Sequence, residues 1–459
     1  MEKFKKVLHN SFFYRIFLWI LRFWFFVVYY KEVKILGRES IPADSPVIFN
    51  PNHPNSFIDD VSILSTNNRN TVIVGHAGLF KNSLITRILI FFRLIPAFRK
   101  EDGKENLYKN QEVFDLGVYV LKHSFALLIF PEARHTGLNH LFPIRKGAIR
   151  IAFKYAQEHN FISPVYMVPV GLYYSDFSRY RSKILINYGK AVNISDFARL
   201  YKIDPAQAIN KVRQILDKRI KSNMLHIPDQ DDYDFFDFMR QVADDFVAGQ
   251  RGKSINDVKD EFEIHKFIID VLYKLKRVDI RAYNKLKKLS DRYMQAIRSL
   301  GIKDTAIEKR FSTGRLVVKT FEAFVFLPVY LLLALNFSVP VILTEFIAAL
   351  FPQRPDKASV RFVAPMVFVP LWVAVQLFIL WKKVNYWWLK VFYAIIHPWL
   401  FIILCELNIW LGNVLIQWKI FLKKDKIKDL ILMRDQLIKT FSEVWKENEL
   451  EKNLEYASF

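Results

Sequence analysis

A histidine and two aspartates follow an early apolar segment of the chain at short spacing. His53 lies in the turn-rich stretch Asn50–Ser56, and Asp59 and Asp60 stand where a helical pattern begins. Histidine can act as a general base near neutral pH, and a nearby carboxylate can fix its tautomer and stabilise the imidazolium. Strand ends are rigid and their loops are open to ligands. We therefore predict that His53 accepts a proton from a substrate, with Asp59 or Asp60 behind it.

Three later stretches carry charged groups that could join His53 at one site. These groups are Arg99 and Lys100; Glu132, Arg134 and His135; and Lys146. Lys146 comes directly before a helical pattern, and the N-terminus of a helix favours an anion. Arginine suits phosphate because its planar guanidinium pairs with two oxygens. Taken singly, each of these groups is explained as well by an ordinary loop charge or a structural ion pair. The sequence has no Cys/His cluster with metal-ligand spacing and no glycine loop that would cradle a phosphate.

The segments that must position these groups alternate between strand and helix. Expected strands are Val33–Leu36, Val47–Phe49, Thr71–Val74, Phe125–Phe130, Tyr166–Val170 and Ile184–Tyr188. Helical patterns lie near residues 57–66, 79–92, 105–121 and 145–158. Apolar strands that alternate with helices predict an α/β domain over residues 35–200, with a largely parallel sheet covered by helices.

Four motifs occur in order within this region. They are Asn52-His53, Ile95-Pro96 with Arg99, Phe130-Pro131-Glu132, and Val168-Pro169-Val170. Together they resemble the glycerophospholipid acyltransferase family, the membrane-bound glycerol-3-phosphate and 1-acylglycerol-3-phosphate O-acyltransferases. The family blocks read N-H-x-x-x-x-D, G-x-I-P-x-x-R, F-P-E-G-x-R-S and V-P-V/I. The resemblance covers less than half of the chain, but four ordered blocks are far more specific than any one motif.

The first block departs from the family pattern by one residue. The family aspartate would fall on Ile58, whereas the carboxylate stands at Asp59, with Asp60 as the alternative. A branch that includes the fungal glycerol-3-phosphate acyltransferases has N-H-x-N-x-F-x-D, and Asn55, Phe57 and Asp59 fit that form. We therefore expect the acid at Asp59, and the spacing favours glycerol-3-phosphate as acceptor.

The second and third blocks also depart from the family. Arg93 and Ala133 stand where the family has glycine. His135 takes the position of the family arginine, and Arg134 lies one residue earlier. Either Arg134 or His135 is therefore the group that reaches phosphate.

The resemblance implies an acyltransferase of phospholipid synthesis. An acyl thioester, acyl-CoA or acyl-carrier protein, would donate its acyl group to a hydroxyl of glycerol-3-phosphate or 1-acylglycerol-3-phosphate, with no cofactor and no metal. His53 would deprotonate that hydroxyl, and Asp59 would orient the imidazole. Arg99, with Arg134 and Lys146 in support, would bind the acceptor phosphate. Glu132 would hold an acceptor hydroxyl or orient the basic groups.

Composition points to a membrane-attached protein with a soluble domain. Of 459 residues, 52% are hydrophobic and 24% charged, and the net charge is +22. Long apolar segments favour anionic membrane lipids over nucleic acid as the partner of this charge. The only cysteine, Cys405, lies in an apolar run and excludes an intramolecular disulfide.

The sequence divides into five parts. We expect a membrane-interface helix at 1–34, the acyltransferase domain at 35–200, a soluble helical region at 201–312, membrane-embedded helices at 313–420 and a basic helical tail at 421–459. The apolar segments are Ala323–Leu343, Phe362–Trp381 and Phe392–Trp418. The domain at 35–200 is expected on the cytoplasmic face.

Individual charged and polar residues support more detailed expectations. Arg15 and Arg22 share one helix face and would extend to the lipid head groups. The acidic stretch Asp229–Asp237 is predicted to be solvated. Asn336 and Glu406 inside apolar segments favour a second hypothesis, a lipid-handling or transport protein whose acyltransferase-like domain only binds phospholipid.

Overall fold

The computed structural model describes residues 2–9, 11–97, 109–308, 312–381, 383 and 385–447. The chain forms two compact units. The first, here called the sheet unit, comprises residues 1–226 and the later segment 343–367. The second, the helical unit, comprises residues 227–342 and the chain from 368 onward. The sheet unit thus extends past residue 200 and includes part of the region expected to be membrane-embedded.

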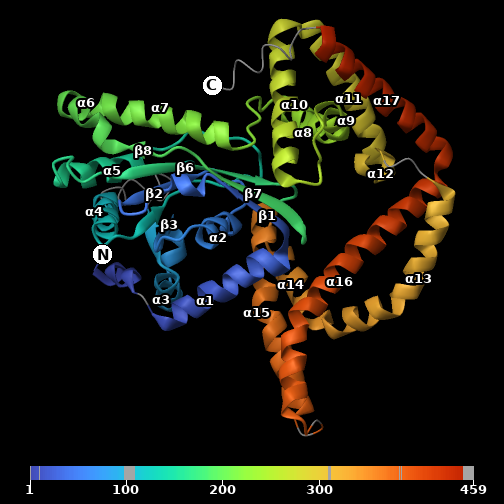
Figure 1. The fold of residues 1–459 in the computed structure, drawn as a ribbon, viewed down its shortest axis with the longest axis horizontal. Helices are drawn as coiled ribbons and strands as arrows, with labels where there is room; N and C mark the ends of the chain where they lie inside the picture. The colour runs from blue at the N-terminus through green and yellow to red at the C-terminus, as the bar shows by residue number, and fades with distance from the viewer. Residues whose placement is uncertain are drawn as a thin grey trace. The chain divides into compact units, whose positions relative to one another are not determined.

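One eight-stranded sheet is the centre of the sheet unit (Figure 1). Its strands are β1 (Tyr30–Leu36), β2 (Val47–Pro51), β3 (Thr71–His76), β4 (Leu94–Ala97), β5 (Ala126–Leu128), β6 (Tyr166–Tyr174), β7 (Ser182–Tyr188) and β8 (Val192–Asn193). The order is β1-β7-β6-β2-β5-β3-β4, and β8 pairs with β6. The β6–β7 and β6–β8 pairs are antiparallel and the others parallel. The predicted fold class is confirmed.

Two strands, β4 and β8, were not expected from the sequence. β4 has four residues and contains Pro96, which cannot donate a ladder hydrogen bond. It is tolerated because β4 lies at the edge of the sheet. β8 has two residues, too few for a periodic pattern.

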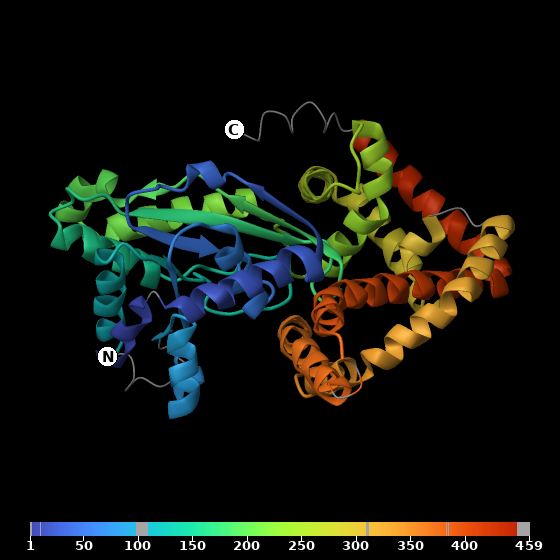
Figure 2. The same ribbon diagram turned by 60° about the horizontal axis from the view of Figure 1, so that its bottom comes forward.

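Helices cover both faces of the sheet (Figures 1 and 2). The helices of the sheet unit up to residue 223 are α1 (Phe12–Phe23), α2 (Phe57–Thr66), α3 (Ser83–Phe91), α4 (Lys109–Lys122), α5 (Gly147–Glu158), α6 (Ala198–Ile203) and α7 (Pro205–Asn223). Apolar side chains of α4, α5 and α7 form one core with inward-facing strand residues such as Ile48 and Leu127. The opposite face carries Phe49 and the fully buried Val61 of α2.

The N-terminal helix α1 has two apolar faces with different surroundings. Tyr14 and Leu21 are buried, whereas Phe13 and Trp19 are about 70% exposed. The expectation that Arg22 extends to the head groups is wrong, because its guanidinium donates to the carbonyls of Leu64 and Asn67 where α2 ends. Such a contact compensates carbonyls that a helix terminus leaves unpaired. Arg15 is exposed.

The helical unit contains two groups of helices. The first group is α8 (Tyr233–Val242), α9 (Asp244–Arg251), α10 (Val258–Val278), α11 (Ile280–Leu300) and α12 (Asp304–Glu308). The expectation that the acidic stretch is solvated is wrong for Asp232, which is 8% exposed. Its carboxylate is bonded to Lys276, Lys287 and the Tyr283 hydroxyl. These donors hold the pKa of Asp232 well below its usual range although burial alone would raise it.

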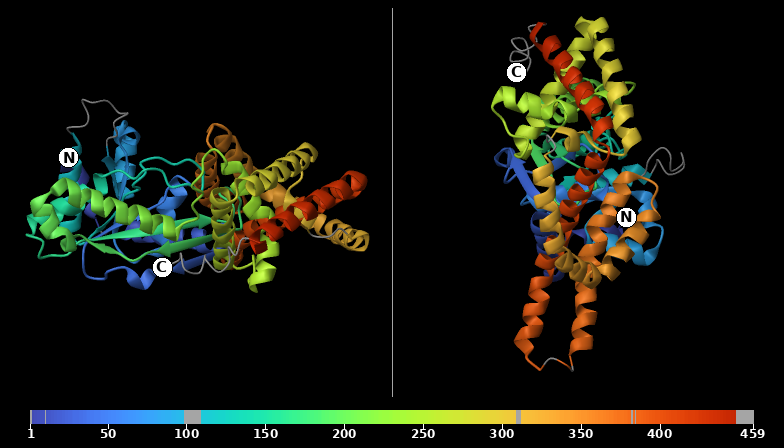
Figure 3. Two further views of the ribbon diagram at one scale, coloured as in Figure 1. Left: turned by 90° about the horizontal axis from the view of Figure 1, so that it is seen from above. Right: turned by 90° about the vertical axis from the view of Figure 1, so that its right-hand side faces the viewer.

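The second group contains long apolar helices, two of which are shared with the sheet unit because residues 343–367 belong to that unit. They are α13 (Thr313–Asn336), α14 (Ser338–Ala349), α15 (Arg354–Leu380) and α16 (Trp387–Leu422), followed by α17 (Lys424–Glu447). Within the described residues, four helical segments are long and apolar enough to cross a membrane: Phe12–Tyr29, Thr313–Asn336, Arg354–Ile379 and Trp387–Leu422. The end of α15 and the start of α16 lie side by side (Figure 3, right). These segments indicate membrane association.

The expected apolar segment Ala323–Leu343 is divided between two helices. α13 ends at Asn336 and α14 begins at Ser338. Pro340 explains the break, because proline has no N–H to donate to the carbonyl four residues earlier, that of Asn336. The Trp372 indole N–H donates to that carbonyl at 2.7 Å instead.

Candidate active site

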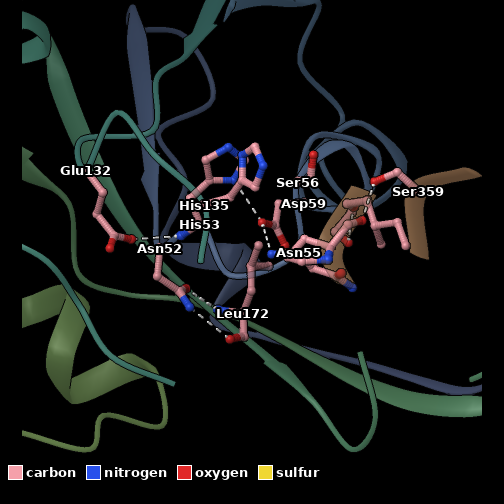
Figure 4. Close-up of polar contacts among 12 residues, drawn as sticks. Asn52, His53, Asn55, Ser56, Asp59, Glu132, His135, Leu172 and Ser359 are labelled. Atoms are coloured by element: carbon pink, nitrogen blue, oxygen red, sulfur yellow. Dashed lines mark hydrogen bonds and ion pairs between the residues drawn. The ribbon is translucent and has the colours of Figure 1, made fainter. Parts of the chain in front are cut away.

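His53 and Asp59 form a hydrogen-bonded pair at the end of β2 (Figure 4). The Nδ1 atom of His53 lies 2.8 Å from Oδ2 of Asp59. The carboxylate is fully buried, and the imidazole is 12% exposed. The pair spans the turn between β2 and α2, so the strand end holds the base and the first helical turn holds the acid. This geometry is what a general base and its orienting carboxylate require.

Two further donors hold the Asp59 carboxylate. The backbone N–H of Asn55 donates to Oδ2 at 2.7 Å, and the Tyr174 hydroxyl donates to Oδ1 at 2.6 Å. Burial raises the pKa of Tyr174 well above its usual value, and the charge of Asp59 adds to this effect. Tyr174 therefore remains a phenol and a donor.

Asp60, the alternative acid, has different surroundings. Its Oδ1 atom is buried and has no hydrogen-bond partner among the described residues. Burial raises the pKa of Asp60 well above its usual range, and the charge of Asp59 raises it further. In this structure Asp59 is the carboxylate that contacts His53.

The contacts of His53 determine which ring nitrogen is available. A carboxylate only accepts, so Nδ1 carries the proton and Nε2 carries the lone pair. No other described residue hydrogen-bonds to the His53 ring. The ring stacks on Phe130 with centroids 3.8 Å apart. Nε2 is therefore the atom that can accept a proton.

Glu132 clamps two backbone segments beside His53. Its Oε1 atom accepts from the His53 backbone N–H and its Oε2 atom from the Phe142 N–H, both at 2.9 Å. Burial raises the pKa of Glu132 to about 7, although both backbone donors act in the opposite direction. Both oxygens are thus engaged in positioning backbone, a role that the sequence did not indicate.

Three buried asparagines fasten the same turn to the sheet. Asn50 donates to the carbonyl of Ile129 on the β5 side at 3.1 Å. Asn52 donates to the Leu172 carbonyl on β6 at 3.1 Å and accepts its N–H at 2.7 Å. Asn55 donates to the Phe177 carbonyl at 2.8 Å. These amides act as backbone substitutes where the chain leaves the ladder, so the turn is held rigidly.

Strand order explains why these groups meet. β2 pairs in parallel with β5 on one side and β6 on the other. The carboxyl ends of all three strands therefore lie side by side, and His53, Glu132 and Tyr174 are found there. Tyr174, the last residue of β6, was missed because an alternating apolar strand pattern does not distinguish a tyrosine with a catalytic neighbour.

The predicted phosphate-binding residues lie in the loop after β5, directly before α5, and outside the described residues. His135 lies close to the base, with the two imidazole centroids 5.5 Å apart. The Arg134 guanidinium lies over the Phe142 ring at 3.5 Å. Lys146 is half-buried directly before α5. Arg99 and Lys100 lie outside the described residues.

Both residues that replace family glycines have left-handed backbone. Arg93 has φ 60° and Ala133 has φ 57°. Glycine adopts this conformation without steric cost, which explains the family preference. Arg93 is buried, lies over the Tyr14 ring at 4.0 Å and donates to Asn70 and to the His9 carbonyl. Its side chain thus ties the N-terminal segment to the sheet.

Part of this chain is similar to known proteins. A family model described as Acyltransferase matches residues 32–173. The comparison with curated protein sequences gave no match. Among solved structures, the chain is similar to the 1-acyl-sn-glycerophosphate (LPA) acyltransferase PlsC from Thermotoga maritima, with 16% identity and a TM-score of 0.33 over 48% of this chain and 84% of that one.

The matched segment contains His53, Asp59 and Glu132 and ends one residue before Tyr174. Residues 32–173, less than half of the chain, are therefore similar to the acyltransferase family, which agrees with the resemblance seen in the sequence motifs.

Proposed function

We propose that this protein is a membrane-bound O-acyltransferase that acylates glycerol-3-phosphate or 1-acylglycerol-3-phosphate in phospholipid synthesis. The observation that carries the proposal is the His53–Asp59 pair, which leaves Nε2 available inside the segment that matches the acyltransferase model. A glycerol phosphate acceptor is favoured by the basic groups of the third block, among them His135, whose ring centroid lies 5.5 Å from that of His53.

The proposed reaction is direct transfer without an acyl-enzyme. Nε2 of His53 takes the proton of the acceptor hydroxyl while that oxygen attacks the thioester carbonyl carbon. Asp59 stabilises the imidazolium that forms. The tetrahedral intermediate expels the thiolate, which takes the proton from the imidazolium. The products are an ester and a free thiol.

Acceptor binding is proposed to use the positive groups of the second and third sequence blocks. Arg99, with Arg134 or His135 and Lys146, is proposed to bind the acceptor phosphate. The N-terminus of α5, which begins at Gly147, adds a positive end of a helix dipole. Positioning by this phosphate site must supplement base catalysis, which contributes about 10²–10⁴-fold.

Membrane attachment serves this chemistry. The acyl chain and the product are lipids, and the exposed apolar face of α1 belongs to the same unit as His53. A basic protein binds an anionic leaflet, which favours the cytoplasmic face for the acyltransferase domain. A soluble thioester then reaches the site from the aqueous side.

The test uses full-length protein in detergent or vesicles, with acyl-CoA or acyl-carrier protein as donor and each of the two acceptors. His53→Ala is expected to lower kcat by about 10³-fold while membrane insertion is unchanged. Equal activity of His53→Ala and the parent protein would rule out the proposed base. The ratio of kcat/KM for the two acceptors shows whether the protein catalyses the first or the second acylation step.

The lipid-transport hypothesis predicts a different result. Movement of phospholipid between vesicles that persists in His53→Ala, together with no acyl transfer by the parent protein under any donor and acceptor pair, would favour transport. The feature that favours this second candidate is the presence of hydrogen-bonded polar side chains in the apolar helices, among them the half-buried Asn336.

A further inference from the structure

The first turn of α15 contacts both loops of the candidate active site. Oδ1 of Asp356 accepts the Ser56 hydroxyl at 3.1 Å and lies 3.3 Å from Nε2 of His135. Ser56 belongs to the turn between β2 and α2, and His135 to the loop after β5. One carboxylate oxygen, 300 residues after Ser56 in the chain, thus joins the first and third sequence blocks.

Ser56 has a backbone conformation that needs support. Its φ of 51° and ψ of −135° are rare for a residue with a side chain, and such a conformation costs about 1–3 kcal/mol. Ser56 also occupies the N-cap of α2, but its side chain does not cap the helix. It donates to Asp356 instead. Because Ser56 lies between His53 and Asp59, this contact fixes the turn that separates the base from its acid.

The segment that carries Asp356 is fastened to the sheet unit at several points. The Tyr180 hydroxyl donates to the Arg361 carbonyl, and the rings of Phe362 and Tyr29 have centroids 4.8 Å apart. The Arg361 guanidinium pairs with both oxygens of Glu345 at 2.8 and 2.7 Å. Asp356 is therefore presented by an ordered segment of the same unit.

Packing beside Asp356 leaves little freedom. Pro355 lies against Gly137, where a Cβ atom would stand 3.3 Å from the proline ring. The N–H of Gly137 donates to the Pro54 carbonyl at 3.0 Å. The loop of His135 therefore contacts the His53 turn directly as well as through Asp356 (Ser56, His135 and Ser359 are labelled in Figure 4).

We propose that Asp356 is a positioning residue that holds His135 and the His53–Asp59 turn in the arrangement that receives the acceptor phosphate. This inference rests on the proposed function. A carboxylate repels phosphate, so Asp356 acts through His135, which stands where the family has arginine. Asp356 also lies in the first turn of α15, a helix that is long and apolar enough to cross a membrane.

The experiment is a double-mutant cycle in the full-length protein, with initial rates measured against acceptor and donor separately. Asp356→Ala is expected to raise KM for the acceptor about tenfold and to change KM for acyl-CoA less than about twofold. In the His135→Ala background the same substitution is expected to have a smaller effect on acceptor KM, because the part of the effect that acts through His135 is already lost. Ser359→Ala is the matched control and is expected to behave as the parent, because Ser359 lies one turn along α15 and its hydroxyl donates to the Pro355 carbonyl of its own helix.

Three kinetic outcomes would overturn the inference. The first is unchanged acceptor KM in Asp356→Ala. The second is multiplication of the two single effects in the double variant, which would mean that Asp356 does not act through His135. An equal loss for acceptor and donor would indicate general distortion of the site and would also contradict positioning of the acceptor.

A second readout separates this inference from failure of the proposed function. If the parent protein acylates neither acceptor, the proposed function fails, and the role in acceptor binding fails with it. The contact is then still measured by melting temperatures of Ser56→Ala, Asp356→Ala and the double variant. Non-additive shifts are expected for a direct contact, and strictly additive shifts would show that the two loops are not joined through Asp356.

Discussion

Two histidines, one in each unit, differ in how many ring nitrogens are engaged. His53 uses Nδ1 for Asp59 and keeps Nε2 available. His397 of α16 is 1% exposed, with Nδ1 at 2.6 Å from the Tyr393 carbonyl and Nε2 at 3.3 Å from the Asn336 amide. The second histidine therefore has no nitrogen left for proton transfer.

The groups that surround the two imidazole rings also differ. Around His53, three donors converge on one carboxylate, and that carboxylate faces the ring. Around His397, neutral groups pair with one another, since Gln376 bonds both Asn336 and Tyr393. The first arrangement is suited to stabilising a positive charge on the imidazole, whereas the second joins apolar helices.

The largest predicted effect separates the two neighbouring acids behind His53. Asp59→Asn is expected to lower kcat by about 10³-fold, because an amide cannot accept from all three donors and allows the wrong imidazole tautomer. Asp60→Asn is expected to change kcat less than about threefold. Initial rates of both purified variants test this, and a larger loss in Asp60→Asn would reverse the assignment.

Glu132 gives the next effect, a pH dependence of stability. Its pKa is about 7 in the folded chain against 4.5 as the ordinary value. The folded state thus binds the proton more tightly, and the stability that protonation contributes is present below about pH 4.5 and lost as pH rises to about 7. Glu132→Gln does not titrate, so the stability of the parent relative to this variant should fall by about 2–3 kcal/mol between pH 5 and pH 8. A difference in melting temperature that is constant with pH would contradict the prediction.

A substitution at Tyr174 tests whether the hydrogen bond from its hydroxyl to Asp59 affects the activity that is proposed for His53. Tyr174→Phe removes one hydrogen bond to a charged group and is expected to lower kcat/KM about tenfold. Tyr188→Phe removes a buried hydroxyl that contacts Thr66 at 2.7 Å and serves as the control. Equal activity of the two variants would exclude a role of Tyr174 in orienting Asp59.

A substitution at His397 is expected to affect stability and not kcat, the opposite of Asp59→Asn. His397→Ala is expected to lower stability by about 1 kcal/mol, the usual contribution of a polar contact between membrane helices. Its kcat per folded molecule should equal that of the parent. Thermal unfolding in detergent and initial rates on the same preparation measure the two quantities, and a selective loss of kcat would give His397 a place in the reaction.

The smallest effect concerns the backbone of the third block. Ala133 has φ 57°, so Ala133→Gly is expected to raise stability by about 1 kcal/mol or less, because relief of steric strain exceeds the added entropy of the unfolded chain. Melting temperature in detergent is the measurement. A lower melting temperature would show that packing of the Ala133 methyl group outweighs the strain.

The sequence by itself determined the alternation of strands and helices, the position of His53 after a strand, and the apolar segments. These properties are local, since apolar periodicity and turn residues act over a few neighbours. The edge strand β4 was missed for the same reason, because its four residues and Pro96 carry too little pattern.

Only the tertiary structure decided which groups surround His53. The choice between Asp59 and Asp60 depends on a turn with a positive φ at Ser56, which helical periodicity does not predict. Tyr174 ends β6 and Glu132 lies in the loop after β5, the two strands that flank β2, and Asp356 comes from a segment 300 residues after Ser56. Contacts between such distant segments follow from strand order and packing, which no local pattern encodes.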